Sequence, residues 1–367
     1  MKTKIAAIFL FILACQLSLA QKKGLSIIAY YSGGPELVDA IPAEKLTHII
    51  FSFCHLKGNR LAVDNSRDSL TISKLVELKK RNDHLKIILS LGGWGGCETC
   101  SQVFSSAEGR KEFSASVLDL NRNFKTDGID LDWEYPAIEG FPGHRFAPED
   151  LQNFTSLVQE LRKILQNNYE ISFAAGGFQK FLNESTEWEP VMKEVDRVNL
   201  MSYDLINGYS TVTGHHTALY TTPAQRESTD NAVQYLIKIG VPREKIVIGA
   251  AFYARIWENV SAEKNGLYQT GKFKSFTDYR QFPEQLNESI GYKFYWDETA
   301  AAPYAYNAER KLFATFDDKR SLSLKTKYAS DQGLGGIMFW EITHDLPENE
   351  LVNTIYAVKE NASMRDK

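Results

Sequence analysis

Residues 127–136 read DGIDLDWEYP, and the fold around this stretch decides what the chain can do. Successive side chains of a β-strand point to opposite faces, so Asp130, Asp132 and Glu134 share one face, and the apolar residues between them share the other. By itself, such alternation is typical of a half-exposed strand in an antiparallel sheet. The rest of the chain must show whether the acidic face meets water or a protein interior.

Short apolar runs alternate with helical patterns on both sides of this stretch. The clearest helical pattern covers 148–165, where acids occupy the first turn and apolar residues recur at helical spacing. Eight strands that alternate with helices predict a parallel sheet closed into a (β/α)8 TIM barrel. An open doubly wound sheet is the rival, but the first strand lacks a G-x-G-x-x-G turn. The predicted strands are Leu25 to Tyr31, His48 to Cys54, Lys86 to Leu91, Gly128 to Glu134, Glu170 to Ala175, Val198 to Tyr203, Lys245 to Ala250 and Gly335 to Trp340.

One interval, from Trp257 to about Lys319, is too long for a connection between a strand and a helix. It breaks into short aromatic pieces, such as 293–296 and 311–316. A structureless loop of this length is improbable in a compact domain. We therefore predict one catalytic barrel domain over 21–367, with an α+β insertion at about 258–319 between strands seven and eight, on the face where barrel active sites lie.

In a parallel barrel the apolar face of 127–136 packs on the helices, and the acidic face points inward. Three stacked carboxyl groups in such an interior are costly unless they share protons and hydrogen bonds, and folds bear that cost mainly at functional sites. Glu134 lies nearest the C-terminal mouth, and Asp130 lies deepest. Repulsion from Asp132 should raise the pKa of Glu134 and keep it protonated as a general acid, within a coupled titration.

A metal site is the main chemical alternative for these carboxyl groups. Asp130-x-Asp132 could hold a hard cation such as Mg²⁺ or Ca²⁺ through oxygen ligands. However, no phosphate-binding Gly-Lys-Ser/Thr motif and no ligand loop accompany the pair. We therefore expect neither a metal nor a cofactor.

The acidic stretch is one of five motifs that occur in order along the chain. It contains Asp127-x-x-Asp130-x-Asp132-x-Glu134, followed by Tyr135-Pro136. The others are Ser90-Leu91-Gly92-Gly93-Trp94, Met201-Ser202-Tyr203-Asp204, Phe252-Tyr253-Ala254-Arg255 and Gly336-Ile337-Met338-Phe339-Trp340, with Tyr295-Trp296-Asp297, Ala302-Pro303-Tyr304 and Phe316-Asp317-Asp318 in the insertion. With these motifs the chain resembles glycoside hydrolase family 18 chitinases over essentially its whole length after residue 20. The insertion resembles that of the deep-cleft subfamily.

The resemblance implies a retaining, substrate-assisted hydrolysis of β-1,4 bonds between N-acetylglucosamine residues, which is an exception to the usual two-carboxylate scheme. Glu134 would protonate the leaving oxygen while the acetamido carbonyl of the same sugar attacks the anomeric carbon. Asp132 would hold the acetamide N–H and stabilise the oxazolinium intermediate, with Asp130 as its deeper partner. Tyr203 would donate its hydroxyl to the acetamide oxygen.

The resemblance also implies a set of substrate-binding residues. Trp340, at the end of the last strand, would form the floor beneath the cleaved sugar. Met201 shares a strand face with Tyr203, and Asp204 follows at the strand mouth, within reach of sugar hydroxyls. The remaining matched positions are Tyr30 and Trp94, at the mouths of strands one and three, and Arg255, after strand seven. For each aromatic residue taken singly, filling the core is an equal alternative.

Four further motif residues are expected to be structural. Asp127 breaks the alternation of its strand and should cap the strand's beginning. Ser90, Gly92 and Gly93 belong to the strand-three motif rather than to the acidic array.

Composition excludes several other classes of function. The 367 residues are 43% hydrophobic and 24% charged, with a formal net charge of −4, as in an ordinary soluble globular protein. Such a chain has no basic field to attract nucleic acid or anionic lipid. We expect a monomer that binds chitin or N-acetylglucosamine oligosaccharides, without nucleic acid and without membrane insertion.

The first twenty residues predict a signal peptide. A short basic start precedes an apolar run from Ile5 to Leu13, and small residues at the cleavage positions favour cutting after Ala20. The protein would then be secreted or periplasmic. A lipid anchor on Cys15 is the alternative, because residues 12–15 loosely resemble a lipoprotein box.

Cleavage after Ala20 would leave three cysteines, of which Cys97 and Cys100 form the close pair. In an exported protein this spacing favours a local disulfide. Redox catalysis would need a thioredoxin-like context, and zinc would need a second ligand pair; the sequence offers neither.

Three functions therefore remain to be separated. A chitinase or chitooligosaccharide hydrolase fits best. An endo-β-N-acetylglucosaminidase acting on N-glycans is the second, although Trp133 and the large insertion count against it. A non-catalytic chitin-binding lectin is the third, although such lectins typically lose the acid at the position of Glu134.

Overall fold

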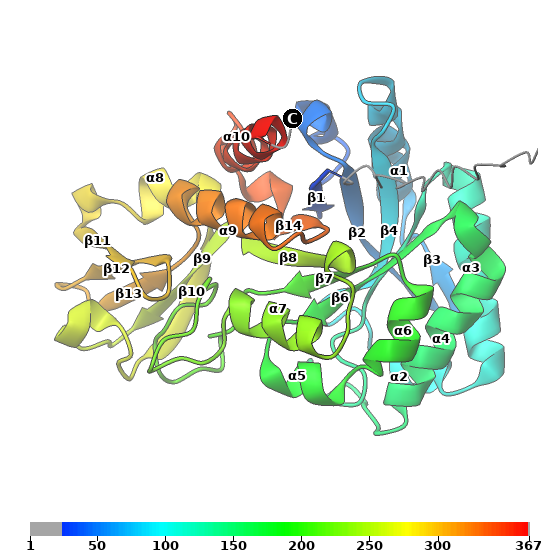
Figure 1. The fold of residues 1–367 in the computed structure, drawn as a ribbon, viewed down its shortest axis with the longest axis horizontal. Coiled ribbons are helices and arrows are strands. Elements are labelled where there is room, and N and C mark those ends of the chain that lie inside the picture. Colours follow the sequence, from blue (N-terminus) through cyan, green and yellow to red (C-terminus); the bar gives the residue numbers. More distant parts are fainter. Residues whose placement is uncertain (1–23, 366–367) are drawn as a thin grey trace, which may run out of the picture.

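The computed structural model describes residues 24–365, which form a closed barrel with a second sheet beside it (Figure 1). Eight parallel strands close on themselves because β1 pairs with both β14 and β2. This arrangement confirms the predicted (β/α)8 TIM barrel. The barrel strands are β1 Ser26–Tyr31, β2 His48–Lys57, β4 Lys86–Gly92, β5 Gly128–Asp132, β6 Glu170–Gly176, β7 Arg197–Met201, β8 Ile246–Ala251 and β14 Gly336–Trp340. The short β3, Arg60–Ala62, forms a hairpin with β2.

Helices surround the barrel and bury the apolar faces of its strands (Figure 1). Trp133, on the apolar side of the acidic stretch, packs with its ring centroid 5.5 Å from Phe104 and 6.4 Å from Phe154. The helices are α1 Ser66–Glu77, α2 Cys100–Phe104, α3 Ala107–Phe124, α4 Asp150–Leu165, α5 Gln179–Glu184, α6 Trp188–Glu194, α7 Thr229–Lys238, α9 Lys319–Asp331 and α10 Glu350–Arg365.

The predicted ends of three barrel strands were wrong by two or more residues, all at the mouth. The strand β2 continues to Lys57, three residues past the predicted Cys54, because its end pairs with β3. The strand β5 ends at Asp132, two residues before Glu134, and β7 ends at Met201, two residues before Tyr203. Glu134 and Tyr203 therefore lie on the turns that leave the barrel. The alternation of polar and apolar residues continues past the last backbone hydrogen bond between the strands. It therefore could not predict the residue at which strand pairing ends.

The insertion is a five-stranded antiparallel sheet between β8 and α9, with strand order β10-β9-β13-β12-β11. Trp257 is fully buried at the centre of its own apolar core. The sheet begins at Tyr253, a few residues before the expected boundary. Its elements are β9 Tyr253–Glu258, β10 Lys272–Asp278, α8 Phe282–Gln285, β11 Tyr292–Asp297, β12 Ala302–Asn307 and β13 Leu312–Thr315.

The predicted signal peptide and Cys15 lie outside the described residues. Within 24–365, no helix is both long and apolar enough to cross a membrane.

Charged residues close the barrel at the N-terminal ends of its strands. Glu170 accepts hydrogen bonds from His48 Nε2 at 3.1 Å and Lys86 Nζ, and it pairs with Arg197 Nη2 at 2.8 Å. Burial alone would raise the pKa of Glu170, but the His48 hydrogen bond and the charge of Arg197 outweigh burial and hold the pKa well below its usual range. Glu170 is therefore an ionised carboxylate that offsets part of the positive charge at the floor of the barrel.

Replacing Glu170 with Gln should destabilise the protein by about 3–5 kcal/mol, because it leaves the buried Arg197 uncompensated. Urea unfolding of the two proteins measures this loss. A carboxylate with a depressed pKa stabilises the fold above its unfolded pKa of about 4.3, so the difference should shrink as pH falls below that value. Glu189→Gln, on a residue with an 83% exposed side chain, is the control and should change little. Equal unfolding midpoints for wild type and Glu170→Gln would contradict this role.

Candidate active site

Asp130 lies at the centre of the barrel, where donors from four strands converge on its carboxylate. One oxygen accepts from Tyr30 Oη at 3.1 Å and Ser90 Oγ at 3.0 Å. The other accepts from Ser172 Oγ at 2.6 Å and Asn199 Nδ2 at 3.0 Å. Burial raises the pKa of Asp130, whereas all four hydrogen bonds oppose that rise. Ser172 and Asn199 were not predicted as site residues, because their only signal in the sequence is a polar side chain within an apolar strand.

Asp132 lies one step nearer the mouth, and its carboxyl group is much less satisfied. The side chain is buried, and Oδ1 has no hydrogen-bond partner among the described residues. Burial raises the pKa of Asp132 well above its usual range, and the charges of Glu134 and Asp130 add to the rise. Asp132 thus offers a buried acceptor that nothing in the described chain occupies.

Glu134 has the elevated pKa that a general acid requires, and a residue outside the acidic stretch contributes to it. Burial raises the pKa of Glu134 to about 7, the negative charge of Asp204 adds to the rise, and a hydrogen bond with Tyr135 opposes it. The charges of Glu134 and Asp132 repel each other, and this repulsion also raises the pKa of Asp132. A carboxyl group with this pKa carries its proton for a substantial fraction of the time near neutral pH.

Asp204 is held as an anion by residues of the insertion. It adopts a left-handed backbone conformation with φ of 56°. Its carboxylate accepts from Tyr253 Oη at 2.8 Å and from two nitrogens of Arg255. Burial would raise the pKa of Asp204, but the hydrogen bonds from Arg255 outweigh burial and keep the pKa well below its usual range, while His216 Nδ1 lies 3.5 Å from the carboxylate. The two expected substrate contacts, Asp204 and Arg255, are therefore partners of each other.

Tyr203 is buried beside this ion pair. Its hydroxyl lies 3.8 Å from Met338 Sδ, and its ring meets Tyr253 edge-on at 6.3 Å. Met201, half-buried, packs against the same small apolar cluster at the top of the barrel. Tyr203 thus reaches the space above the barrel core from the turn after β7, with only β6 between that strand and the β5 strand of Asp132.

The aromatic residues expected to contact sugar differ in how accessible they are. Trp94 is 47% exposed and lies 5.6 Å from Phe141. Trp340 is half-buried and stacks on Phe53 at 5.6 Å. Tyr30, which was expected at the mouth, is only 2% exposed, and its hydroxyl donates a hydrogen bond to Asp130. Trp94 and Trp340 are therefore the faces that remain open to a ligand, and Tyr30 is part of the core.

The glycines of the strand-three motif let two backbones approach closely. Gly93 N–H donates to the carbonyl of Asp132 at 3.0 Å. Gly92 has φ of +107°, and a Cβ there would lie 2.2 Å from that same carbonyl oxygen. A Cβ on Gly93 would lie 2.3 Å from the ring of Phe53. Larger residues at either position would displace Asp132 or the ring beneath Trp340.

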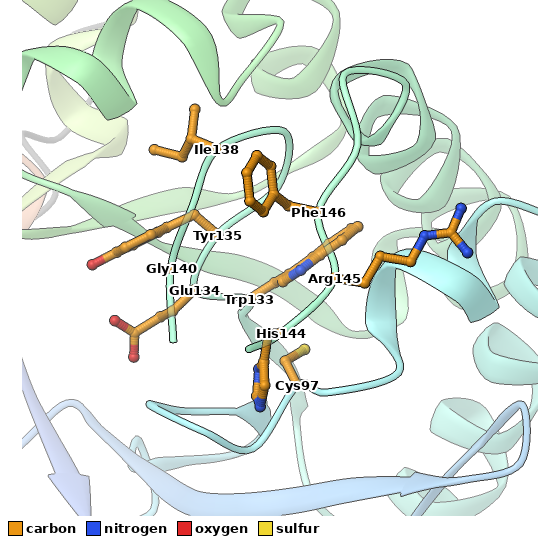
Figure 2. Close-up of a pocket in the computed structure, with 9 residues that line it drawn as sticks. All are labelled: Cys97, Trp133, Glu134, Tyr135, Ile138, Gly140, His144, Arg145 and Phe146. Atoms are coloured by element: carbon orange, nitrogen blue, oxygen red, sulfur yellow. The ribbon is translucent and has the colours of Figure 1, made fainter. Parts of the chain in front are cut away.

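A loop after β5 folds over Glu134 and forms a small pocket (Figure 2). Figure 2 shows the carboxyl group of Glu134 and the hydroxyl of Tyr135 on the same side of this loop, whereas Arg145 points the opposite way. A disulfide joins Cys97 to Cys100 at the edge of the pocket. The lining residues are Cys97, Trp133, Glu134, Tyr135, Ile138, Gly140, His144, Arg145 and Phe146.

Asp127 lies at the other end of β5, far from the mouth. Its carboxylate accepts from the backbone N–H of Ile87 at 2.7 Å and pairs with Lys79 Nζ at 2.6 Å. These contacts tie the beginnings of β4 and β5 together. Over the described part of the chain, His, Cys, Asp and Glu side chains do not gather into a group of three that could hold a metal ion.

This geometry agrees with what comparison with known proteins finds. A sequence model of the family described as glycosyl hydrolases family 18 matches residues 26–345. The chain belongs to this family. The resemblance drawn from the five motifs is thereby confirmed, and the deep-cleft subfamily stays a prediction.

Relatives within family 18 include chitinases and an N-acetylglucosaminidase. Chitinase A1 of Niallia circulans is 36% identical over 299 residues, which cover 75% of this chain and 42% of that protein. Chitinase B of Serratia marcescens is 28% identical, over 84% of this chain and 75% of that protein. A solved family 18 N-acetylglucosaminidase from Paenibacillus barengoltzii is 34% identical with a TM-score of 0.83, over 91% of this chain and 99% of that one. The chain thus spans less than half the length of Chitinase A1.

The charge of Asp204 should set the alkaline limit of activity. Asp204→Asn removes a negative neighbour that raises the pKa of Glu134, so this pKa should fall and the acid should lose its proton at lower pH. The alkaline limb of the kcat profile should therefore move toward acid. The control Asp127→Asn makes the same chemical change at the barrel floor and should leave the limb in place. An unmoved limb in Asp204→Asn would show that Asp204 does not influence the acid.

Proposed function

We propose that this family 18 protein hydrolyses β-1,4 bonds between N-acetylglucosamine residues in chitin or its oligosaccharides, by a retaining, substrate-assisted mechanism. The observation that carries the proposal is that two neighbouring carboxyl groups, Glu134 and Asp132, are suited to different roles. Glu134, with a pKa of about 7, can give up a proton at the mouth, while Asp132 keeps an unpartnered oxygen within the barrel. Environments that separate the behaviour of neighbouring acids are typical of glycosidase sites.

In the first step the Glu134 proton passes to the glycosidic oxygen as the bond from that oxygen to the anomeric carbon breaks. The carbonyl oxygen of the sugar's own acetamide attacks the anomeric carbon and gives an oxazolinium ion. The unpartnered oxygen of Asp132 accepts the acetamide N–H, and the loss of the Glu134 proton leaves the coupled Asp132–Glu134 pair one unit more negative, which balances the new positive charge. The Tyr203 hydroxyl, whose sulfur contact with Met338 is a weak one, donates to the acetamide oxygen.

In the second step a water molecule adds to the anomeric carbon while the Glu134 carboxylate takes its proton. The bond to the acetamide oxygen breaks, and the sugar leaves with its original configuration after two inversions. The sugar ring would stack on Trp340, and Trp94 would flank the next unit, because both rings keep an accessible face. Asp130 takes no part in proton transfer, since its oxygens are occupied by four donors.

We also propose that the protein is exported. The residue pattern at 1–20 and the disulfide between Cys97 and Cys100 both support an oxidising compartment. The intact mass of the protein from its native source distinguishes cleavage after Ala20 from acylation at Cys15. The mass of the uncleaved, unmodified chain would contradict both cleavage after Ala20 and acylation at Cys15.

Hydrolysis of N-acetylglucosamine oligomers, followed by the masses of the products, tests the proposed reaction. We expect cleavage of fully acetylated oligomers and none of fully deacetylated ones, because the latter lack the attacking carbonyl. Glu134→Gln should lose about 10²–10⁴-fold in kcat while still binding oligomers, since only the transferable proton is removed.

The same assay separates the competing functions. An N-glycopeptide cleaved faster than the oligomers would favour the endo-β-N-acetylglucosaminidase alternative, and binding without turnover would favour the lectin. The product masses also show whether the enzyme releases single sugars, as the name of the Paenibacillus relative suggests for that protein, or cuts internally. Cleavage of the deacetylated oligomers at a comparable rate would contradict the mechanism.

A further inference from the structure

The Phe316-Asp317-Asp318 motif has no place in the reaction described above, although it lies where α9 begins. Asp318 caps α9 by accepting from the backbone N–H of Ser321 at 2.8 Å. Asp317 has a different partner: its carboxylate contacts Lys325 Nζ at 2.7 Å, and neither side chain is accessible to solvent. An ion pair with no solvent contact is expensive to bury, and such pairs contribute little to stability by themselves. The question is what this pair holds in place.

Every polar atom of the pair is satisfied by a specific neighbour. Asp317 Oδ1 accepts from Ser321 Oγ at 2.7 Å, and Oδ2 accepts from the backbone N–H of Ala251 at 3.0 Å. Lys325 Nζ also donates to Thr217 Oγ1 at 2.5 Å. Ala251 is the last residue of β8, and Thr217 lies on the connection that follows β7. The pair therefore joins α9 to the mouth ends of two barrel strands.

The hydroxyl of Thr217 has one proton and two acceptors within reach. It lies 3.1 Å from Asp317 Oδ2 and 3.3 Å from the backbone carbonyl of Ser202. Asp317 Oδ2 already accepts from Lys325 and Ala251, whereas the Ser202 carbonyl has no other side-chain donor among the described hydrogen bonds. We assign the proton to Ser202, so that the positive charge of Lys325 polarises a chain that ends at this carbonyl.

Ser202 immediately precedes Tyr203 and is held on its other side as well. Its hydroxyl donates to the carbonyl of Gly249 at 3.0 Å and accepts from the N–H of the same residue at 3.0 Å. The Tyr203 ring then rests directly on that backbone, because a Cβ on Gly249 would lie 2.9 Å from Tyr203 Cε1. The peptide that carries Tyr203 is thus fixed to β8 from one side and to Thr217 from the other.

We propose that Thr217, held by the buried Lys325–Asp317 pair, is a positioning residue for Tyr203. It fixes the Ser202 peptide and so places the phenol that orients the substrate's acetamide. This inference rests on the proposed function, in which Tyr203 contacts the sugar. A misplaced donor weakens interactions with the reacting atoms while the rest of the substrate still binds.

Thr217→Val tests the proposal, because it keeps the shape of the side chain and removes the hydroxyl. We expect kcat on acetylated oligomers to fall by about 10- to 100-fold with KM nearly unchanged. Thr217→Ser restores the hydroxyl and should recover most of kcat. The matched control is Thr326→Val, a buried threonine of α9 whose hydroxyl donates only within its own helix, to the Leu322 carbonyl at 2.7 Å. It should leave kcat unchanged.

A double-mutant cycle shows whether the effect passes through Tyr203. In a Tyr203→Phe background, Thr217→Val should lower kcat no further, because the donor that it positions is already gone. An equal loss in both backgrounds would overturn the proposal, as would a kcat loss in Thr217→Val that Thr217→Ser does not recover. Wild-type kcat in Tyr203→Phe would overturn the role of Tyr203 itself, and with it this inference, while leaving Glu134 and the reaction untouched. If Tyr203→Phe has no measurable turnover, the Thr217→Ser recovery and the KM values decide.

Discussion

The four hydrogen bonds to Asp130 are the interaction on which the rest of the site depends. They occupy both oxygens of the deepest carboxylate with donors from β1, β4, β6 and β7. A carboxylate satisfied in this way has no free lone pair with which to bind a proton shared with Asp132. Asp132 is therefore left buried, with one oxygen unpartnered and next to Glu134. The array is thus satisfied at its deepest carboxylate and keeps a free acceptor nearer the mouth.

The insertion contributes charged and polar side chains to the barrel mouth, in addition to forming one side of it. Its first strand, β9, carries Tyr253 and Arg255, which hold Asp204 ionised. The charge of Asp204 in turn helps to keep a proton on Glu134. The opposite end of the barrel follows another rule, because Glu170 is there surrounded by three basic side chains and stays an anion. The carboxylate at the floor is therefore surrounded by basic groups, whereas Glu134 at the site lies among other acids that help to raise its pKa.

Local pattern predicted much of this fold, because each barrel strand is a separate apolar run and the acidic face is visible as alternation. Contacts across the barrel could not be predicted in the same way. Ser172 and Asn199 meet Asp130 only because the sheet closes, and Asp204 approaches Glu134 only through the turn after β7. The same reason explains why the sequence did not reveal the contribution of Asp204 to the pKa of Glu134, and why it placed Tyr30 at the mouth rather than in the core.

The central claim is that the substrate's own acetamide attacks the anomeric carbon after Glu134 has given up its proton. Proton NMR of the new reducing end, recorded in the first minutes of hydrolysis of an acetylated oligomer, tests this claim most directly. Two successive inversions predict the β anomer first, followed by slow conversion to the equilibrium mixture. An α anomer in the earliest spectra would mean that water attacks directly, and it would contradict the account.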